Sequence, residues 1–239
     1  MRQNQTPLIN KKDDNMAKLT HLLPKGTRKK LKAYLRDDSQ KDRERKEARI
    51  AKVPLADKHM ANCELLLNRS IMLSKLKKGG SVAEIGVDRG EFSEQIIDMT
   101  EPAVLHLVDT WGTDRYHSGL FESVTKRFEN YIDNGRVKID RKMSTEAAAD
   151  FAENYFDWIY IDTDHSYKTT REELRKYAPK MKADGIIAGH DYSMGNWTGA
   201  YRYGVIEAVH EFCVEHDWEL VFLTLEPIEG QSFAIRRIR

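Results

Sequence analysis

Ionisable side chains follow short apolar runs at four places in the sequence, and their types suit ligand binding and proton transfer. Carboxylates bind cations, hydroxyl groups or metal ions, and a histidine beside a carboxylate can accept a proton near neutral pH. Because the carboxyl ends of parallel strands share one edge of a sheet, such residues would meet in one crevice. The residues concerned are Glu84, Asp109, Asp162, Asp164, His165, His190 and Asp191.

The first of these places combines an acid with a glycine-containing turn. Residues 81–92 read Ser-Val-Ala-Glu-Ile-Gly-Val-Asp-Arg-Gly-Glu-Phe, which predicts a strand, a tight turn and the start of a helix. A dinucleotide fingerprint that begins at Gly86 would need two further glycines, where this chain has Asp88 and Glu91. The turn therefore offers no pyrophosphate cradle, and Glu84 beside it would attract a cation or hydroxyl groups.

The second place carries a single acid, Asp109, at the end of an apolar run over residues 103–108. It lies about 20 residues beyond the glycine turn, where nucleotide-binding α/β folds hold the two hydroxyl groups of a ribose. Trp111 follows it, and two roles are open for this side chain. It could cover an adenine ring, or it could pack in the core.

The elements that would position these residues alternate between buried strands and amphipathic helices. This alternation predicts an α/β fold with a doubly wound, mostly parallel sheet. Strands are predicted at 82–87, 103–108, 136–139, 156–161 and 186–189, with a closing antiparallel pair at 218–225 and 233–238, and helices at 60–76, 92–99, 121–132 and 169–181.

Three motifs carry a resemblance to a known family. Residues 84–90, Glu-x-Gly-x-x-x-Gly, resemble motif I of class I S-adenosylmethionine (SAM) methyltransferases. Residues 162–167, Asp-x-Asp-His-Ser-Tyr, and 190–192, His-Asp-Tyr, resemble the macrocin O-methyltransferase and cephalosporin-hydroxylase-like group of that class, also called methyltransferase family 24-like. The resemblance covers roughly residues 56–239. It implies a Rossmann-like sheet of seven mostly parallel strands with a C-terminal antiparallel hairpin.

The resemblance also implies a cofactor, SAM, whose methionine part would lie over the glycine turn. Its adenosine half would lie beside Asp109, and Ser144 stands where family members often contact the adenine. The residues implied in SAM binding are Glu84, Gly86, Asp88, Gly90, Asp109, Thr110, Trp111, Ser144 and Asp162.

Relatives in this group commonly hold Mg²⁺ or another divalent ion at residues ending the fourth and fifth strands. Matched by position, the ligands here are Asp162, His190 and Asp191. The family usually has an acid where His190 stands, and a histidine would admit Mn²⁺ or Fe²⁺ more readily than an all-oxygen site. His165 matches the position of a basic residue in catechol-type relatives and is the expected catalytic base, with Asp164 as its rival.

The charge is distributed unevenly along the chain. Residues 1–80 hold 21 Lys and Arg against 9 Asp and Glu, whereas residues 81–239 hold 18 against 29. We expect two parts: a basic helical arm over residues 1–55, and the methyltransferase domain over residues 56–239. The arm would either pack on the acidic domain or bind an anionic surface or polyanion such as lipid headgroups, phosphoglycan or RNA.

Other features bound the function. No apolar run approaches the ~20 residues of a membrane span, and the N-terminus lacks a signal-peptide pattern. We therefore expect a cytoplasmic protein. Trp197 and Tyr201 in the loop 193–203 would line an acceptor pocket or form a subunit contact in a homo-oligomer.

The sequence thus favours a SAM-dependent O-methyltransferase, assisted by a divalent metal, that acts on a hydroxyl group of a small-molecule or glycan acceptor. A sugar or a secondary metabolite is the favoured substrate. One alternative is a metal-independent methyltransferase acting on nitrogen, carboxylate or RNA. Another is a non-catalytic SAM-binding module anchored by its basic arm.

Overall fold

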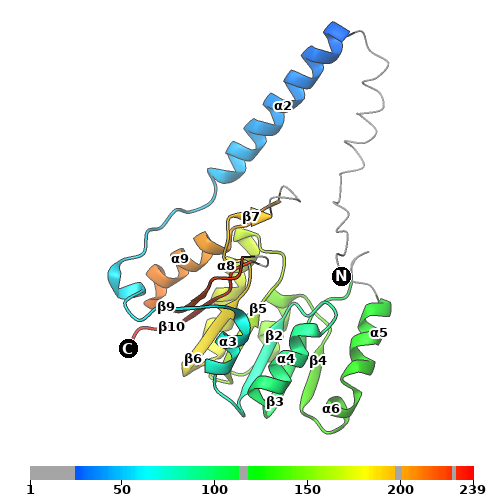
Figure 1. Ribbon diagram of the computed structural model, residues 1–239, viewed down its shortest axis with the longest axis vertical. Coiled ribbons are helices and arrows are strands. Elements are labelled where there is room, and N and C mark those ends of the chain that lie inside the picture. The colour runs from blue at the N-terminus through cyan, green and yellow to red at the C-terminus, as the bar shows by residue number, and fades with distance from the viewer. Residues whose placement is uncertain (1–24, 113–117, 197–200, 228–229) are drawn as a thin grey trace. The chain divides into compact units, whose positions relative to one another are not determined.

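The computed structural model describes residues 25–112, 118–196, 201–227 and 230–239 (Figure 1). The chain divides into two compact units, Met1–Ala51 with Asn196–Arg202, and Lys52–Gly195 with Tyr203–Arg239. In the first unit, helix α2 (Lys25–Glu47) ends in a carboxylate that pairs with Arg202, at 3.1 Å from its Nε. In the described part of the chain no helix has the length and apolar character needed to cross a membrane.

The second unit is built on one sheet whose eight strands have the order β1-β9-β10-β6-β5-β2-β3-β4. Pairing is parallel except along β10, which runs antiparallel to both β6 and β9. The strands are β1 (Glu64–Leu66), β2 (Ser81–Ile85), β3 (Val104–Val108), β4 (Val137–Asp140), β5 (Phe156–Ile161), β6 (Met181–Gly189), β9 (Trp218–Thr224) and β10 (Phe233–Arg237). The predicted Rossmann-like α/β fold with a terminal antiparallel hairpin is confirmed.

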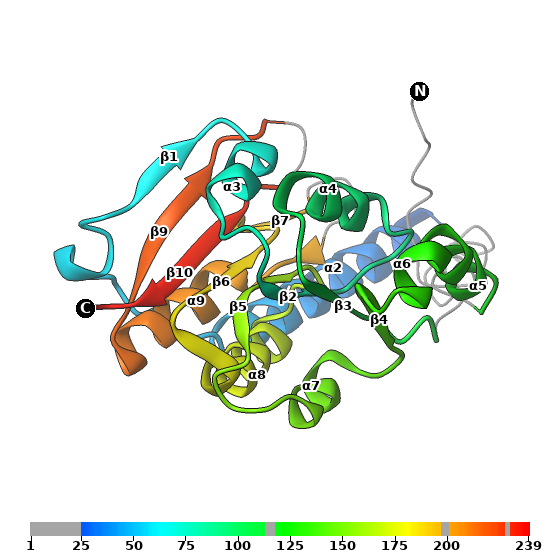
Figure 2. The same cartoon turned by 90° about the horizontal axis from the view of Figure 1, so that it is seen from below.

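Helices cover both faces of this sheet. Figure 2 shows α3 and α4 on one face, and α7, α8 and α9 on the other. The helices are α3 (Arg69–Lys75), α4 (Glu91–Thr100), α5 (Ser118–Arg127), α6 (Glu129–Asp133), α7 (Ser144–Ala147), α8 (Tyr167–Tyr177) and α9 (Val205–His216), with 3-10 turns at Asp57–His59, Ala148–Asp150 and Ala178–Lys180 and a small ribbon of β7 (Gly195–Asn196) and β8 (Tyr201–Arg202).

The central strands form because their residues are buried on both faces. All six residues of β5 are buried, as expected for an apolar run in the middle of a parallel sheet. Successive residues along the strands pack alternately into two hydrophobic cores, one under α8 and α9 and one under α3 and α4. Because β2 and β5 pair directly, Ile85 lies beside Ile161, and the residues that follow both strands emerge together at one sheet edge.

The segment before the glycine turn differs from the prediction. Instead of one helix over 60–76, the chain forms β1 and then the short helix α3, which makes the sheet eight-stranded rather than seven-stranded. Asn68 causes the break because its backbone is extended and its side-chain oxygen accepts the N–H of Ile71, which caps α3. The apolar residues before it, Leu65 and Leu67, are exposed, so their helical spacing did not reflect a buried face.

The predicted helix over 121–132 is likewise divided. Helix α5 ends at Arg127, and α6 begins at Glu129. Phe128 between them is buried, and its ring lies against Gly90 in the turn after β2.

Candidate functional site at the carboxyl ends of the strands

The glycine turn is packed against the end of β5. Gly86 has φ of +91°, and a Cβ atom placed on it would lie 1.9 Å from the carbonyl oxygen of Asp162. The backbone N–H of Gly86 donates to Val108, and that of Asp162 donates to Ile85. The sequence therefore folds with β2, β3 and β5 ending side by side, which places their terminal acids around one turn.

Glu84 lies beneath this turn, where it is 2% exposed. It accepts a hydrogen bond from the hydroxyl group of Ser93 on α4. Burial raises the pKa of Glu84 to about 8, while the Ser93 hydrogen bond and the charge of Arg69 oppose the increase. Without a ligand, Glu84 therefore favours its protonated form near neutral pH, and a cation bound beside it would favour the ionised form.

Asp109 holds the turn from the neighbouring strand. Its Oδ2 accepts the backbone N–H groups of Val87 at 2.9 Å and Asp88 at 3.2 Å, and its Oδ1 accepts that of Trp111 at 2.9 Å. A carboxylate offers about four acceptor positions, so Asp109 retains capacity for a ligand hydroxyl. Asp88 adopts a left-handed conformation with φ of +52°.

Trp111 is fully buried, and its indole N–H donates to the carbonyl oxygen of Asp88 at 3.0 Å. In this conformation the ring is a packing group that ties the loop after β3 to the glycine turn, the second of the two roles left open by the sequence. Arg141 fixes the same loop, donating to the carbonyl oxygens of Thr110 and Trp111 at 3.2 Å each. Thr110 itself is half-buried at the loop surface.

Ser144 begins α7 and lies near a buried acid on α8. Glu173 is fully buried and accepts a hydrogen bond from Thr163 at 3.1 Å. Burial raises the pKa of Glu173 to about 7, although the hydroxyl groups of Ser144 and Thr163 oppose the increase. The Ser144 hydroxyl thus already has a polar neighbour within the chain.

The ends of β5 and β6 bring two acids and two histidines together. His165 Nε2 lies 2.9 Å from Oδ1 of Asp162, and His165 Nδ1 lies 3.4 Å from Oδ2 of Asp191. His190 Nδ1 lies 3.6 Å from each of the same two carboxylates. The four side chains therefore form one linked cluster, as expected from their positions after adjacent strands.

Electrostatics within this cluster favour the charged forms of His165 and Asp162. Burial lowers the pKa of His165, but the hydrogen bond and negative charge of Asp162 and the charge of Asp191 outweigh it, so the pKa is raised. Burial conversely raises the pKa of Asp162, yet the hydrogen bond with His165 and the nearby His190 bring it below its usual value. The imidazole and the carboxylate stabilise each other as an ion pair.

Asp164, the rival base, makes hydrogen bonds outside this cluster. Its carboxylate accepts the backbone N–H of Ser166 at 2.9 Å and the hydroxyl group of Thr169 at 2.8 Å, and the residue is exposed. Ser166 in turn caps α8 by accepting the N–H of Thr169. Asp164 therefore stabilises the start of α8, and His165 has the more suitable contacts for proton transfer.

Asp162, His190 and Asp191 have donor types that suit a divalent ion, but their arrangement here is that of ion pairs. Asp162 and Asp191 both face His165, and no group of three or more His, Cys, Asp or Glu side chains in the described ranges surrounds a metal position. His190 Nε2 is buried and makes no hydrogen bond within those ranges. As placed, these residues do not form a metal site.

The backbone at the site adopts uncommon conformations. Four non-glycine residues that follow strand ends have positive φ, namely Asp88, Trp111, His165 and Asp191, with values from +40° to +59°. Left-handed φ is uncommon for non-glycine residues and clusters at functional sites, where the surrounding structure enforces it. Here it turns the chain sharply at the ends of β2, β3, β5 and β6.

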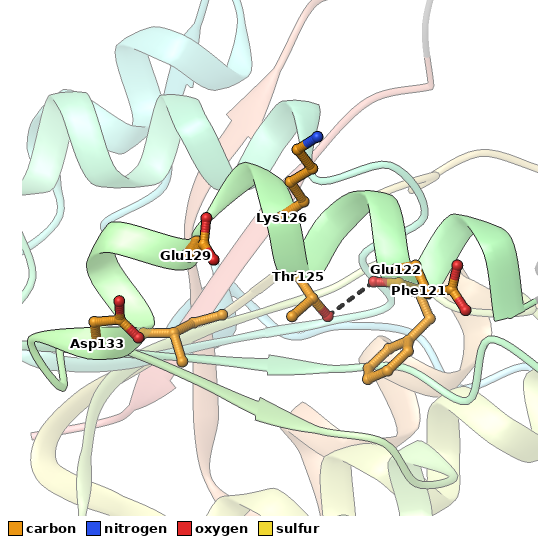
Figure 3. A pocket seen from close by; sticks show the side chains of 7 residues that line it. Phe121, Glu122, Thr125, Lys126, Glu129 and Asp133 are labelled. Atoms are coloured by element: carbon orange, nitrogen blue, oxygen red, sulfur yellow. Dashed lines mark hydrogen bonds between the residues drawn. The ribbon is translucent and has the colours of Figure 1, made fainter.

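The 193–203 loop is described only in part. Trp197 lies outside the described residues, and Tyr201 in β8 is 49% exposed. A separate hollow of about 490 Å³ runs along α5 and α6, lined by Phe121 and Ile132 together with charged side chains (Figure 3). None of the site residues predicted from the sequence lines it.

Two contributors to the crevice were not anticipated from the sequence. Ser93 has a recognisable position, three residues into the helix that follows Gly90, from which its side chain reaches Glu84. Arg69 lies in the region predicted to be a continuous helix, so no local signal singled it out. Its guanidinium group lies 4.6 Å from the ring centre of Phe92 in the first turn of α4.

Comparisons with known proteins relate the central part of the chain to a known domain. A family model described as a methyltransferase domain matches residues 83–192, which include the glycine turn and the ends of β2, β3, β5 and β6. No curated protein matches the sequence of the chain.

Solved structures with similar folds include the pyocyanin biosynthetic protein PhzM, at 13% identity and a TM-score of 0.54 over 72% of this chain and 54% of that one. The ribosomal protein L11 methylase from Lactobacillus delbrueckii subsp. bulgaricus has 14% identity and a TM-score of 0.50 over 71% and 77%. Geranyl diphosphate methyltransferase in complex with SAM has 7% identity and a TM-score of 0.54 over 71% and 84%. Residues 83–192 therefore match a methyltransferase domain, and the chain shares the fold of these solved methyltransferases.

Proposed function

We propose that this methyltransferase acts on a hydroxyl group of a polar acceptor, with a sugar in a glycan or secondary metabolite as the favoured class. The observation that carries the proposal is the position of His165 between Asp162 and Asp191, at 2.9 and 3.4 Å. A neutral hydroxyl is a weak nucleophile, so its methylation benefits from a base held at the reacting centre. Amines that are already unprotonated have less need of one.

The proton path follows from the two contacts of His165. In the neutral form of His165, the shorter contact of Nε2 with Asp162 favours the tautomer that carries its proton on Nε2, and Nδ1, which faces Asp191, is then the atom that accepts a proton. Bound SAM would supply the methyl group, and its transfer to the acceptor oxygen would break the carbon–sulfur bond and leave the electron pair on sulfur. The acceptor proton passes to Nδ1 of His165, and the two carboxylates stabilise the imidazolium that forms.

The cofactor role of the glycine-turn residues is part of the same proposal. SAM supplies a methyl group on a positively charged sulfur and carries an ammonium group. Glu84 would bind the ammonium, Asp109 the ribose hydroxyls, and the turn at Gly86 and Gly90 would allow close approach of the ligand. Asp88, Thr110, Trp111, Ser144 and Asp162 complete the proposed surface. Trp111 contributes to it by packing beneath the turn rather than by exposing its ring.

We retain a divalent ion in the proposal on donor chemistry alone. Asp162, His190 and Asp191 would hold it, and Mg²⁺, Mn²⁺ or Fe²⁺ would act as a Lewis acid on the acceptor hydroxyl. No step described above depends on the ion. The proton transfer to His165 uses only residues whose contacts are present in the structure.

The basic arm is proposed as a second point of attachment, to an anionic surface or polyanion. Within α2, the first twelve residues contain lysines and arginines but no acid, and the exposed residues include Lys29 and Lys30. Binding of this kind should weaken steeply with salt because it releases counterions. Residues 1–24, the rest of the predicted arm up to α2, lie outside the described residues.

The test of the acceptor class is a methyl-transfer assay with matched acceptors. Purified protein is incubated with SAM and, separately, with sugars or phenols, amines, carboxylates and RNA, and release of S-adenosylhomocysteine is measured. We expect turnover with hydroxyl acceptors that falls when the hydroxyl is replaced by hydrogen. Turnover with only amines, carboxylates or RNA would overturn the hydroxyl proposal.

A further inference from the structure

An arginine outside the matched family region lies against the same crevice. Arg69 is the first residue of α3, and its guanidinium group stacks 4.6 Å from the centre of the Phe92 ring. Phe92 in turn packs 4.4 Å from the ring of Tyr160 on β5. The arginine therefore lies between the first turn of α4 and the end of β5, beside the glycine turn.

The backbone of Arg69 also makes a specific contact. Its N–H donates to the Glu226 carboxylate at 2.5 Å, and Glu226 also accepts the hydroxyl group of Thr224. Thr224 accepts the N–H of Ser232 at 2.7 Å, and the Ser232 hydroxyl lies 2.9 Å from that of Tyr160. This chain of polar contacts begins at the Arg69 backbone and returns to the Tyr160 hydroxyl, which the guanidinium group also reaches.

The charge of Arg69 acts on a buried acid of the site. It opposes the burial that raises the pKa of Glu84. Glu84, which contacts Ser93 of α4, and Arg69, which begins α3, thus offer a carboxyl group and a guanidinium group within electrostatic reach of each other. A pair of opposite charges in one crevice suits a ligand that carries both signs on adjacent groups.

The methionine part of SAM is such a ligand, because one carbon bears both an ammonium and a carboxylate. We propose that Arg69 binds the carboxylate of the methionine part of SAM while Glu84 binds its ammonium. A guanidinium group matches a carboxylate with two parallel hydrogen bonds, which a lysine cannot reproduce. This inference rests on the binding of SAM at the glycine turn, and it adds the residue that recognises the amino acid end of the cofactor.

The experiment compares SAM with decarboxylated SAM, which keeps the sulfonium and the amine but lacks the carboxylate. Calorimetry on the full chain should show that the wild type prefers SAM. Arg69→Gln should weaken SAM binding about 10- to 100-fold, the range for hydrogen bonds to charged groups. It should leave decarboxylated SAM within about twofold of the wild type, because a ligand without the carboxylate never engages the arginine.

Two controls accompany this comparison. Arg175→Gln removes an arginine of α8 that pairs with Glu215 of α9 at 2.5 Å. This variant should leave the affinities for both ligands unchanged. Arg69→Lys keeps the positive charge but cannot make the two parallel hydrogen bonds of a guanidinium group. It should weaken SAM binding by an intermediate factor and leave the affinity for decarboxylated SAM unchanged.

The inference is overturned if the wild type binds both ligands equally, a result that needs no variant to fold. It is also overturned if Arg69→Gln weakens both ligands by the same factor. Failure of the wild type to bind either ligand would instead remove the SAM site on which the inference rests, so the two failures are distinguishable.

Discussion

The carbonyl oxygen of Asp162 lies 1.9 Å from the position that a Cβ atom on residue 86 would occupy. Gly86 is therefore required twice over, by its φ of +91° and by the close approach of the β5 backbone. Because the oxygen belongs to the main chain, it cannot move aside as a side chain would. The contact joins the glycine turn to the acid that begins the histidine cluster.

Gly86→Ala should accordingly destabilise the protein strongly and abolish SAM binding. Gly135→Ala is the matched control, because Gly135 also has positive φ, +77°, but a Cβ atom there would meet nothing within 4 Å. The control should lose only about 1–2 kcal/mol of stability, because alanine is strained in this left-handed backbone conformation. Thermal unfolding measures both, and equal losses for the two variants would show that the contact with Asp162 adds nothing.

His165→Ala should lower the rate of methyl transfer by about 10²–10⁴-fold, the usual contribution of a positioned base. Binding of SAM should change little, because the proposed cofactor contacts lie at the glycine turn. His216→Ala is the control, since that histidine lies exposed at the end of α9. Unchanged turnover in His165→Ala would exclude the base.

Removal of metal tests the donor set Asp162, His190 and Asp191. We predict that EDTA lowers the rate of methyl transfer, that Mg²⁺ or Mn²⁺ restores it, and that Asp191→Ala is nearly inactive while still binding SAM. Retained SAM binding follows because the Asp191 carboxylate pairs with His165 and His190 rather than with the residues of the glycine turn. Full activity in EDTA would contradict the metal-assisted reaction and leave His165 with Asp162 as the proton-transfer unit.

Glu173 should make stability depend on pH. Its pKa is about 7 in the folded chain against an ordinary value of 4.5, so the folded state keeps a proton that the unfolded state releases between these values. The contribution is complete below pH 4.5 and is lost as pH rises to about 7, a change of roughly 3 kcal/mol. Glu173→Gln should therefore match the wild type near pH 4.5 and exceed it at pH 8.

Glu172→Gln provides the control for this pH prediction. Glu172 is the neighbouring acid, exposed in part and paired with Lys176 on the surface of α8. Its substitution should leave the difference in stability from the wild type nearly constant with pH. Melting curves from pH 4.5 to 8 decide between the two, and parallel curves for Glu173→Gln and the wild type would show that Glu173 ionises normally.

The parallel strands and the acids at their ends were accessible from the sequence. Strand β5 coincides with the predicted run 156–161 because a strand buried on both faces is mostly apolar. Its one charged residue, Asp157, is buried and paired with Lys77 and Lys182. Since parallel strands end at one sheet edge, the position of Asp162, His165 and Asp191 directly after two predicted strands was enough to predict that they converge. The structure differs from the prediction where the same local sequence pattern is compatible with either a helix or a strand.

The region before the glycine turn shows why such cues fail. Leu65 and Leu66 have the spacing of a helix, yet Leu66 is buried in a short edge strand while Leu65 is exposed, because pairing with β9 overrides the local pattern. The position of Arg69 then depends on Glu226, which lies 157 residues away in the chain. No pattern within a short window contains that information. The burial of Trp111 is similarly set by Phe121 on a separate helix, with ring centres 5.3 Å apart.

The central claim, that SAM binds over the glycine turn beside Asp109, is tested most directly by calorimetry. The wild type and Asp98→Ala, which changes an exposed acid on α4, should bind SAM equally and should not bind NAD. Asp109→Ala should bind SAM at least about tenfold more weakly, because it loses both the ribose contact and the carboxylate that holds the N–H groups of Val87 and Asp88. Binding of NAD without SAM, or unchanged SAM affinity in Asp109→Ala, would contradict the account.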